Sequence, residues 1–339
     1  MRAKSSNGRR CGDKTLNAPR KMSITNYELR ITNLKSGLRF LAVLSVLFFS
    51  AGISFAQDFV ISQEEVDLLP YQTIFQTKTT TANIERKRDA LLELRNYRTA
   101  NASRIAVSAL KDSSEIVRAT AAFAVIFLPP DEAVRNLLPL LGDKKPLVRR
   151  EAAYALGKVG NPNAVNPLLL ITQKDKIPEV RNAAVVALGE IGDAAAVSEL
   201  IKFLQRKPQS KEEFMRRSAA RSIGQIAQII QTNRREIITP KNFLPDEFKK
   251  TERPNYPKLT GSFPVFRSAI GVLIQVLQNP QDFPDVKREA AFALGAIGDE
   301  SAISVLQANL DDADYYLAEI CRESLRRIAV YAEYAKMNQ

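Results

Sequence analysis

The stretch VRREAAYALGKVG at residues 148–160 decides the fold, because it returns thirty-two residues later as VRNAAVVALGEIG at residues 180–192. The phrase recurs as VRATAAFAVIF (117–127), MRRSAARSIGQI (215–226) and VKREAAFALGAIG (286–298), with weaker copies RKRDALLEL (86–94) and LAEICRESLRRI (317–328). The copies start 31, 31, 32, 35, 71 and 31 residues apart, and we interpret the 71-residue step as two repeats that hold an insertion. A fixed period with one apolar pattern per unit predicts a solenoid, in which each unit buries its apolar face against its neighbours.

Each copy has the spacing of an amphipathic helix. At roughly 100° per residue, one stripe of the third copy collects its core residues, namely Val148, Ala152, Ala155, Leu156 and Val159. A shorter helix is expected before each copy, for example at residues 132–141 with Asp131 as its cap. Gly160 stands where a left-handed helix cap is expected. No window alternates with period two for the length of a strand, so the sequence predicts an all-α, right-handed α-solenoid of about seven helical hairpins.

An aspartate precedes three of the copies at a fixed distance from an arginine. The pairs are Asp112 with Arg118, Asp143 with Arg149, and Asp175 with Arg181. Stacking sets these residues along one edge, where each arginine can reach its own aspartate or that of the next unit. We interpret them as a structural ladder of ion pairs, and the alternative is an arginine track for phosphates.

The VRxxAAxALGxIG phrase and the Asp-to-Arg offset resemble HEAT-like repeats of the short kind. That kind is found in bilin lyase subunits, in deoxyhypusine hydroxylase and in many bacterial proteins. The resemblance covers about residues 84–337, apart from the insertion, and it implies the fold rather than an activity, because the phrase itself is scaffold. We expect a lead-in at 57–83, repeats at 84–231, an irregular insertion at 232–263 that is rich in proline, and repeats with a C-terminal cap at 264–339.

Residues 1–56 have the organisation of a signal peptide with a long n-region. Lys35 and Arg39 precede an apolar stretch at 40–56 that ends in Ser54, Phe55 and Ala56. We expect cleavage after Ala56, export to the periplasm or the cell exterior, and no stable membrane insertion afterwards. The alternative is an N-terminal membrane anchor.

The net charge of +12 is concentrated in the same segment. Residues 1–56 hold ten Lys and Arg and two acidic residues, which leaves a net charge of +4 for the remainder. That is an ordinary solubility charge, so we expect no nucleic-acid partner.

The chain contains no histidine and two cysteines. The lack of histidine excludes Ser-His-Asp nucleophiles and the usual His/Cys zinc sites. It also excludes the His-Glu di-iron centre that the resemblance to deoxyhypusine hydroxylase would imply. We expect no catalytic residue, metal or cofactor, and interpret Cys321 as a small buried residue and the glycines of the ALGxxG phrase as helix caps.

A column on the second helix of each unit is the candidate binding surface. Tyr154 lies roughly 140° from the centre of the core stripe, so it is expected to face outward. The equivalent positions are Phe123, Val186, Arg221, Phe292 and Glu323, and beside them run Arg150, Asn182, Arg217 and Arg288. The resemblance to HEAT-like arrays places the second helices on the concave side. The alternative is that the aromatic residues pack against a neighbouring helix or the insertion.

These features favour a non-catalytic scaffold of the cell envelope that binds a protein or peptide on its concave face. The alternative is a lyase-type enzyme or enzyme subunit like the bilin lyase subunits, and nucleic-acid binding is less favoured.

Overall fold

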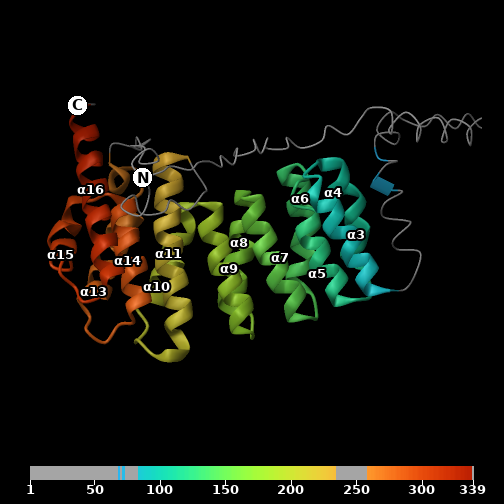
Figure 1. The fold of residues 1–339 in the computed structure, drawn as a ribbon, viewed down its shortest axis with the longest axis horizontal. Helices are drawn as coiled ribbons and strands as arrows, with labels where there is room; N and C mark the ends of the chain where they lie inside the picture. Colours follow the sequence, from blue (N-terminus) through green and yellow to red (C-terminus); the bar gives the residue numbers. More distant parts are fainter. Residues whose placement is uncertain (1–67, 69–70, 73–82, 234–257, 338–339) are drawn as a thin grey trace, which may run out of the picture. The chain divides into compact units, whose positions relative to one another are not determined.

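The fold is seen in a computed structural model that describes residues 68, 71–72, 83–233 and 258–337. The expected signal peptide and most of the expected lead-in and insertion lie outside these residues. Across the described residues the regular elements are all helices, with no strand, as the sequence predicts (Figure 1). No helix in this part of the chain has both the length and the apolar character needed to cross a membrane.

The described helices form six hairpins, each made of a first and a second helix. The first helices are α4 (Ala100–Ala106) with η1 (Val107–Lys111), α6 (Pro130–Leu137) with η2 (Leu138–Gly142), α8 (Val165–Lys174), α10 (Val197–Leu204), α13 (Val265–Gln278) and α15 (Ile303–Gln307). The second helices are α5 (Glu115–Ala124), α7 (Pro146–Val159), α9 (Pro178–Ile191), α11 (Ser210–Thr232), α14 (Pro284–Ile297) and α16 (Tyr315–Met337). Helix α3 (Ile84–Asn96) packs against α5 as a seventh second helix.

The second helices stand in one row, in the order α3, α5, α7, α9, α11, α14 and α16 (Figure 1). Helix α11 packs directly against α14, and α13 is the first helix of the hairpin that contains α14. The interpretation of the 71-residue step as two repeats is therefore wrong. That step holds one repeat, and its extra length lies between Thr232 and α13.

The ends of the helices follow the sequence signals in part, since the helix expected at 132–141 ends as α6 at Leu137 and continues as η2. Gly160 ends α7 in the left-handed conformation, with φ of 68°, as its position after the last apolar residue predicts. Asp131 is not the cap of α6, because that helix begins at Pro130, whose fixed φ suits the first turn. The Asp131 carboxylate instead accepts a hydrogen bond from the Asn161 side chain at 2.7 Å.

From α7 onward, consecutive second helices approach so closely that only glycine fits at one position of each contact. A Cβ added to Gly189 would lie 2.9 Å from the Cα of Ser222, and one added to Gly157 would lie 2.8 Å from the Cα of Ala187. The same holds for Gly224 against α14 and for Gly295 against α16. The first glycine of the ALGxxG phrase is thus a contact residue inside the helix, and only the second glycine is a cap.

This contact predicts the effect of an added methyl group. Gly189→Ala is expected to lower the free energy of unfolding by about 1–3 kcal/mol, because backbone atoms of α11 must move. The matched control is Gly271→Ala in α13, where an added Cβ meets nothing within 4 Å. There alanine is expected to stabilise by about 0.5–1 kcal/mol through its higher helix propensity. Urea denaturation of both variants provides the measurement, and equal effects would contradict the packing argument.

Candidate functional site

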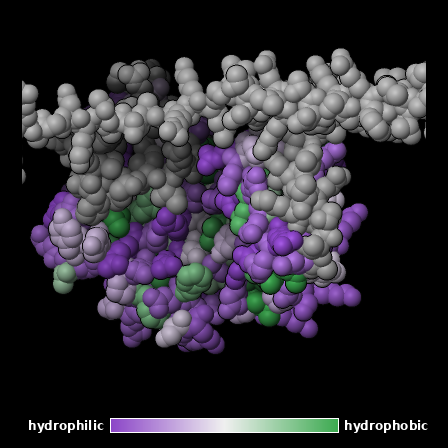
Figure 2. All heavy atoms as spheres, turned by 45° about the vertical axis from the view of Figure 1, so that its right-hand side comes forward, coloured by the Kyte–Doolittle hydropathy of each residue, from purple (hydrophilic) through white to green (hydrophobic). Residues whose placement is uncertain are grey.

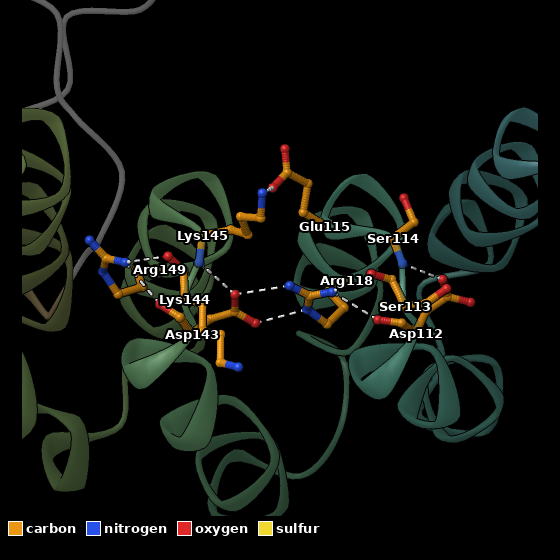
Figure 3. Close-up of polar contacts among 9 residues, drawn as sticks. All are labelled: Asp112, Ser113, Ser114, Glu115, Arg118, Asp143, Lys144, Lys145 and Arg149. Carbon is orange, nitrogen blue, oxygen red and sulfur yellow. Dashed lines mark hydrogen bonds and ion pairs between the residues drawn. The ribbon is translucent and has the colours of Figure 1, made fainter.

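A ladder of ion pairs joins the turns that connect first to second helices (Figure 3). The Arg118 guanidinium donates from Nε and Nη2 to the Asp143 carboxylate at 2.8 and 2.9 Å. Its Nη1 donates to the backbone carbonyl of Asp112 at 2.9 Å, so this arginine links two consecutive turns. The sequence left open whether each arginine pairs with the aspartate of its own unit or with that of the next unit. In the structure Arg118 pairs with the carboxylate of the next unit.

The next arginines repeat this arrangement in part. Arg149 donates to the Asp175 carboxylate at 2.6 and 3.0 Å, and to the backbone carbonyl of Asp143 at 2.8 Å. Arg149 and Asp143 therefore meet through the backbone carbonyl, and the carboxylate of Asp143 belongs to Arg118. Arg181 makes the backbone contacts of the series, with the carbonyls of Asp175 and Lys176 at 2.9 and 3.3 Å.

The ladder continues at both ends beyond the residues that the sequence indicated. Lys87 pairs with Asp112 at 2.6 Å. Arg216 pairs with Asp282 across 66 residues of chain, and both side chains are buried. Lys87 and Arg216 occupy the arginine position of their copies, which is the signal that could have found them. Asp282 follows the insertion, where the repeat register is lost.

These contacts favour the ionised carboxylates. The hydrogen bond from Arg118 holds the pKa of Asp143 below its usual value, against the opposing effect of burial. For Asp175, burial is the largest single influence and acts to raise the pKa. The hydrogen bonds from Arg149 and from the Ile177 N–H, with the charges of Arg149 and Arg181, together outweigh burial, so the pKa of Asp175 lies below its usual value. The ladder therefore consists of ionised aspartates paired with arginine guanidinium groups.

The predicted binding column on the second helices is less exposed than expected. Phe123, Tyr154, Val186 and Phe292 are half-buried, and Asn182 and Glu323 are fully buried. The physical reason is that the second helices from α5 to α14 each have a second helix packed on both sides, which covers the flanks of the column.

The aromatic side chains of the column have partners within the protein. The ring of Phe123 lies 5.5 Å from the Arg95 guanidinium, and the ring of Phe292 lies 5.9 Å from the Arg327 guanidinium. Phe292 also fills the space beside Gly224. Tyr154 packs against the core, and burial raises the pKa of its hydroxyl. Packing against neighbouring helices, which was the alternative interpretation, therefore describes these rings better than a fully exposed column does.

The arginines of the column are paired with acidic residues. The ion pairs are Arg150 with Glu151 at 2.6 Å, Arg217 with Asp285 at 3.1 Å, Arg221 with Glu289 at 2.7 Å, and Arg288 with Asp285 and Asp314 at 2.7 and 2.8 Å. Three of the four arginines thus reach an acidic residue of the next unit, as in the ladder. Burial raises the pKa of Glu289 although Arg221 opposes it.

Exposed aromatic residues lie at the starts of α11 and α16, N-terminal to the column residues Arg221 and Glu323 of the same helices. Phe214 is 55% exposed and Tyr316 is 57% exposed. Arg217 lies 5.0 Å from the Phe214 ring, and Arg288 lies 5.4 Å from the Tyr316 ring. Asp285 pairs with both arginines, so these five residues form one continuous group across α11, α14 and α16. We call this group the aromatic–arginine patch.

The repeat register contains the signal for this patch. Phe214, Asp285 and Tyr316 each stand directly before the residue that begins a copy of the phrase, as Ile116 and Leu147 do in earlier units. Sequence reasoning did not consider the exposure of that position. Figure 2 shows a largely hydrophilic surface on which hydrophobic residues gather in small separate groups.

The described residues contain few candidates for a metal site or a catalytic nucleophile. No group of three or more His, Cys, Asp or Glu side chains within them is placed to hold a metal ion. The buried Cys321 has a pKa raised to about 12 by burial, so its sulfur is a thiol rather than a thiolate nucleophile at neutral pH.

Fold and repeat geometry together define an α-solenoid. The family model for HEAT repeats matches residues 104–189, 166–234 and 261–326, which is more than half of the chain. The chain therefore belongs to the HEAT repeat family.

The curated relatives match a short part of the chain. Deoxyhypusine hydroxylase of Gallus gallus is 40% identical over 70 residues, which are 21% of this chain and 23% of the relative. The enzyme of Homo sapiens is 40% identical over 60 residues, or 18% of this chain and 20% of the relative. The match thus spans less than a quarter of the length of these relatives.

Solved structures resemble the chain at low identity. The structure of human deoxyhypusine hydroxylase in complex with glycerol covers 78% of this chain and 97% of its own, with 19% identity and a TM-score of 0.35. The CpcE and CpcF complex of phycocyanin lyase from Nostoc sp. PCC7120 covers 83% of this chain and 98% of its own, with 18% identity and a TM-score of 0.41. At these values the likeness carries no argument about function.

The ladder makes a prediction about stability. Arg118→Ala and Asp143→Ala are each expected to lower the free energy of unfolding by about 1.5–3 kcal/mol at neutral pH, because each strands a charged partner. The double variant is expected to lose less than the sum. Since the folded-state pKa of Asp143 is lowered, its contribution is present above the unfolded pKa of about 3.9 and is lost as the pH falls through the folded value.

Chemical denaturation at neutral and acidic pH measures these effects. The control is Lys145→Ala, which removes an exposed ion pair to Glu115 and is expected to cost at most about 1 kcal/mol. A direct charge pair would be contradicted if the losses of unfolding free energy in the two single variants added up in the double variant and were the same at neutral and acidic pH.

Proposed function

We propose that this protein is a non-catalytic scaffold that binds a partner protein through the aromatic–arginine patch. The observation that carries the proposal is the exposure of Phe214 and Tyr316 at the two ends of an arginine and aspartate network. Aromatic residues and arginine are enriched at the energetic centres of protein interfaces. The arginines are already oriented by Asp285, so little side-chain entropy is lost when a partner binds.

The proposal moves the binding surface from the predicted column to the starts of three second helices. Arg217 and Arg288 belong to both surfaces, whereas Phe123 and Phe292 are excluded because their rings pack within the protein. Tyr315 extends the patch, since it is 62% exposed and its ring stacks edge-on against Tyr316 at 5.9 Å.

The lyase-type alternative rests on resemblance alone. The curated relatives are also enzymes, the deoxyhypusine hydroxylases, but they match this chain over a short segment only. A chromophore bound to the purified protein would absorb visible light, and such an absorbance would favour an enzyme over a scaffold.

Partner capture with matched variants tests the patch. The double variant Phe214→Ala with Tyr316→Ala is expected to capture at least tenfold less partner, because it removes both aromatic side chains of the patch. Its melting temperature is expected to change little, because both side chains are mostly exposed. The control is Leu170→Ala on the first helix α8, which is 49% exposed and should leave capture unchanged. Unchanged capture by the double variant, or equal loss in the control, would contradict the proposal.

Export is the second part of the proposal, and it is supported by the apolar stretch and by Ser54, Phe55 and Ala56. The mature protein is expected to begin at Gln57. Sequencing the N-terminus of protein isolated from its native cell checks this, and an intact segment 40–56 on a protein from the cytoplasmic fraction would exclude it.

A further inference from the structure

The ladder has one arginine whose opposite acidic residue is missing from the sequence. Arg118, Arg149 and Arg216 each pair with an aspartate that lies in the next turn of the array. Arg181 belongs to the same series, and within the described part of the chain no acidic side chain lies within ion-pair distance of it. The turn that should supply the partner follows α10, and residues 200–211 contain no Asp or Glu.

The orientation of Arg181 follows from its backbone contacts. Its Nη1 donates to the carbonyls of Asp175 and Lys176, just as Nη1 of Arg149 donates to the carbonyls of Asp143 and Lys144. In Arg149 this arrangement directs Nε and Nη2 to a carboxylate. The same edge of the Arg181 guanidinium is therefore directed toward the turn after α10.

That turn differs from the others in length as well as in charge. Arg216 reaches carbonyls of its own turn 12 and 10 residues upstream, whereas Arg118 reaches carbonyls 6 and 5 residues upstream. Gln205 follows α10 at the position where Asp112, Asp143 and Asp175 follow their helices. The longer turn thus carries a neutral residue in place of the ladder aspartate.

Exposed lysines surround this position. Lys174 and Lys176 lie on the turn of Arg181, and Lys207 and Lys211 lie on or beside the turn after α10. The nearby Arg206 is paired with Glu212 at 3.1 Å. Glu179 and Glu213 also lie in these segments, but the four lysines and Arg181 outnumber them, so the local surface attracts anions. The guanidinium edge of Arg181 is shaped for the two oxygens of a carboxylate.

We infer that Arg181 is a docking point for a carboxylate side chain of an acidic peptide segment in a partner protein, which completes the ladder from outside. A carboxylate is favoured over a nucleic-acid backbone because the other ladder arginines are neutralised by aspartates. The edge therefore offers one guanidinium fork and scattered lysines, whereas nucleic-acid binding rests on many phosphate contacts. No residue of the aromatic–arginine patch belongs to this site, so the inference does not depend on the patch, although Lys211 stands only three residues before Phe214 on α11.

Fluorescence anisotropy with a labelled oligo-aspartate peptide and the full chain at low ionic strength tests the inference. Arg181→Ala is expected to weaken binding about tenfold, since it removes two charge-assisted hydrogen bonds. Arg181→Lys is expected to weaken binding nearly as much, because lysine keeps the charge but lacks the planar fork. The control Lys144→Ala removes an exposed charge beside the completed contact between Arg118 and Asp143, and it should change affinity less than twofold.

Circular dichroism and melting temperature establish that each variant is folded, and Arg181→Lys provides the second readout should Arg181→Ala unfold. Wild-type affinity in Arg181→Lys would overturn the inference in favour of unspecific charge attraction. A labelled oligodeoxythymidylate is expected to bind more weakly than the peptide and without dependence on Arg181. Arg181-dependent binding of that oligonucleotide at equal affinity would replace the acidic peptide by nucleic acid.

Discussion

The backbone approach between consecutive second helices is the constraint on which the other features depend. Gly157 and Gly189 bring their helices against α9 and α11 with no room for a side chain. This contact sets the distance from one repeat to the next, because two helices that touch through their backbones cannot slide apart without exposing core. Small residues at the contact also explain why the repeated phrase is rich in alanine.

The repeat distance in turn sets what an arginine can reach. The Gly157 contact fixes the distance between α7 and α9, and across it Arg149 spans from the carbonyl of Asp143 to the carboxylate of Asp175. The same reach holds for Arg216 and Asp282, although 66 residues separate them in sequence, because α11 and α14 are neighbours in space. The extra chain between these helices therefore leaves the stack itself unbroken. Where the opposite aspartate is absent, at Arg181, the same geometry leaves a guanidinium edge without an internal acidic partner among the described residues.

Much of the fold could be predicted from periodicity, because each copy carries its own helix and cap signals. The left-handed cap at Gly160 and the residues of the ladder depend on local spacing, which the sequence contains. Which of the two aspartates each arginine contacts depends on how the units stack, and the sequence left that open. The Arg216 and Asp282 pair could not be found, since the insertion hides the register that relates them. The exposure of the column was overestimated, because helical angle places Tyr154 on a surface but does not say how close the next helix stands. The interior glycines were interpreted as caps for the same reason.

The surface follows from these contacts. Arg217, Arg221 and Arg288 pair with acids of neighbouring units, and the aromatic rings of the column lie against the protein. The exposed side chains of Phe214 and Tyr316 are therefore the ones that we propose contact a partner. Hydroxyl-radical footprinting, with and without a captured partner, tests this most directly, because it measures the solvent access of individual aromatic side chains. The account predicts rapid oxidation of Phe214, Tyr315 and Tyr316 in the free protein and strong protection in the complex, with Leu170 unchanged. Protection of Leu170 with continued oxidation of Phe214 and Tyr316 would contradict it.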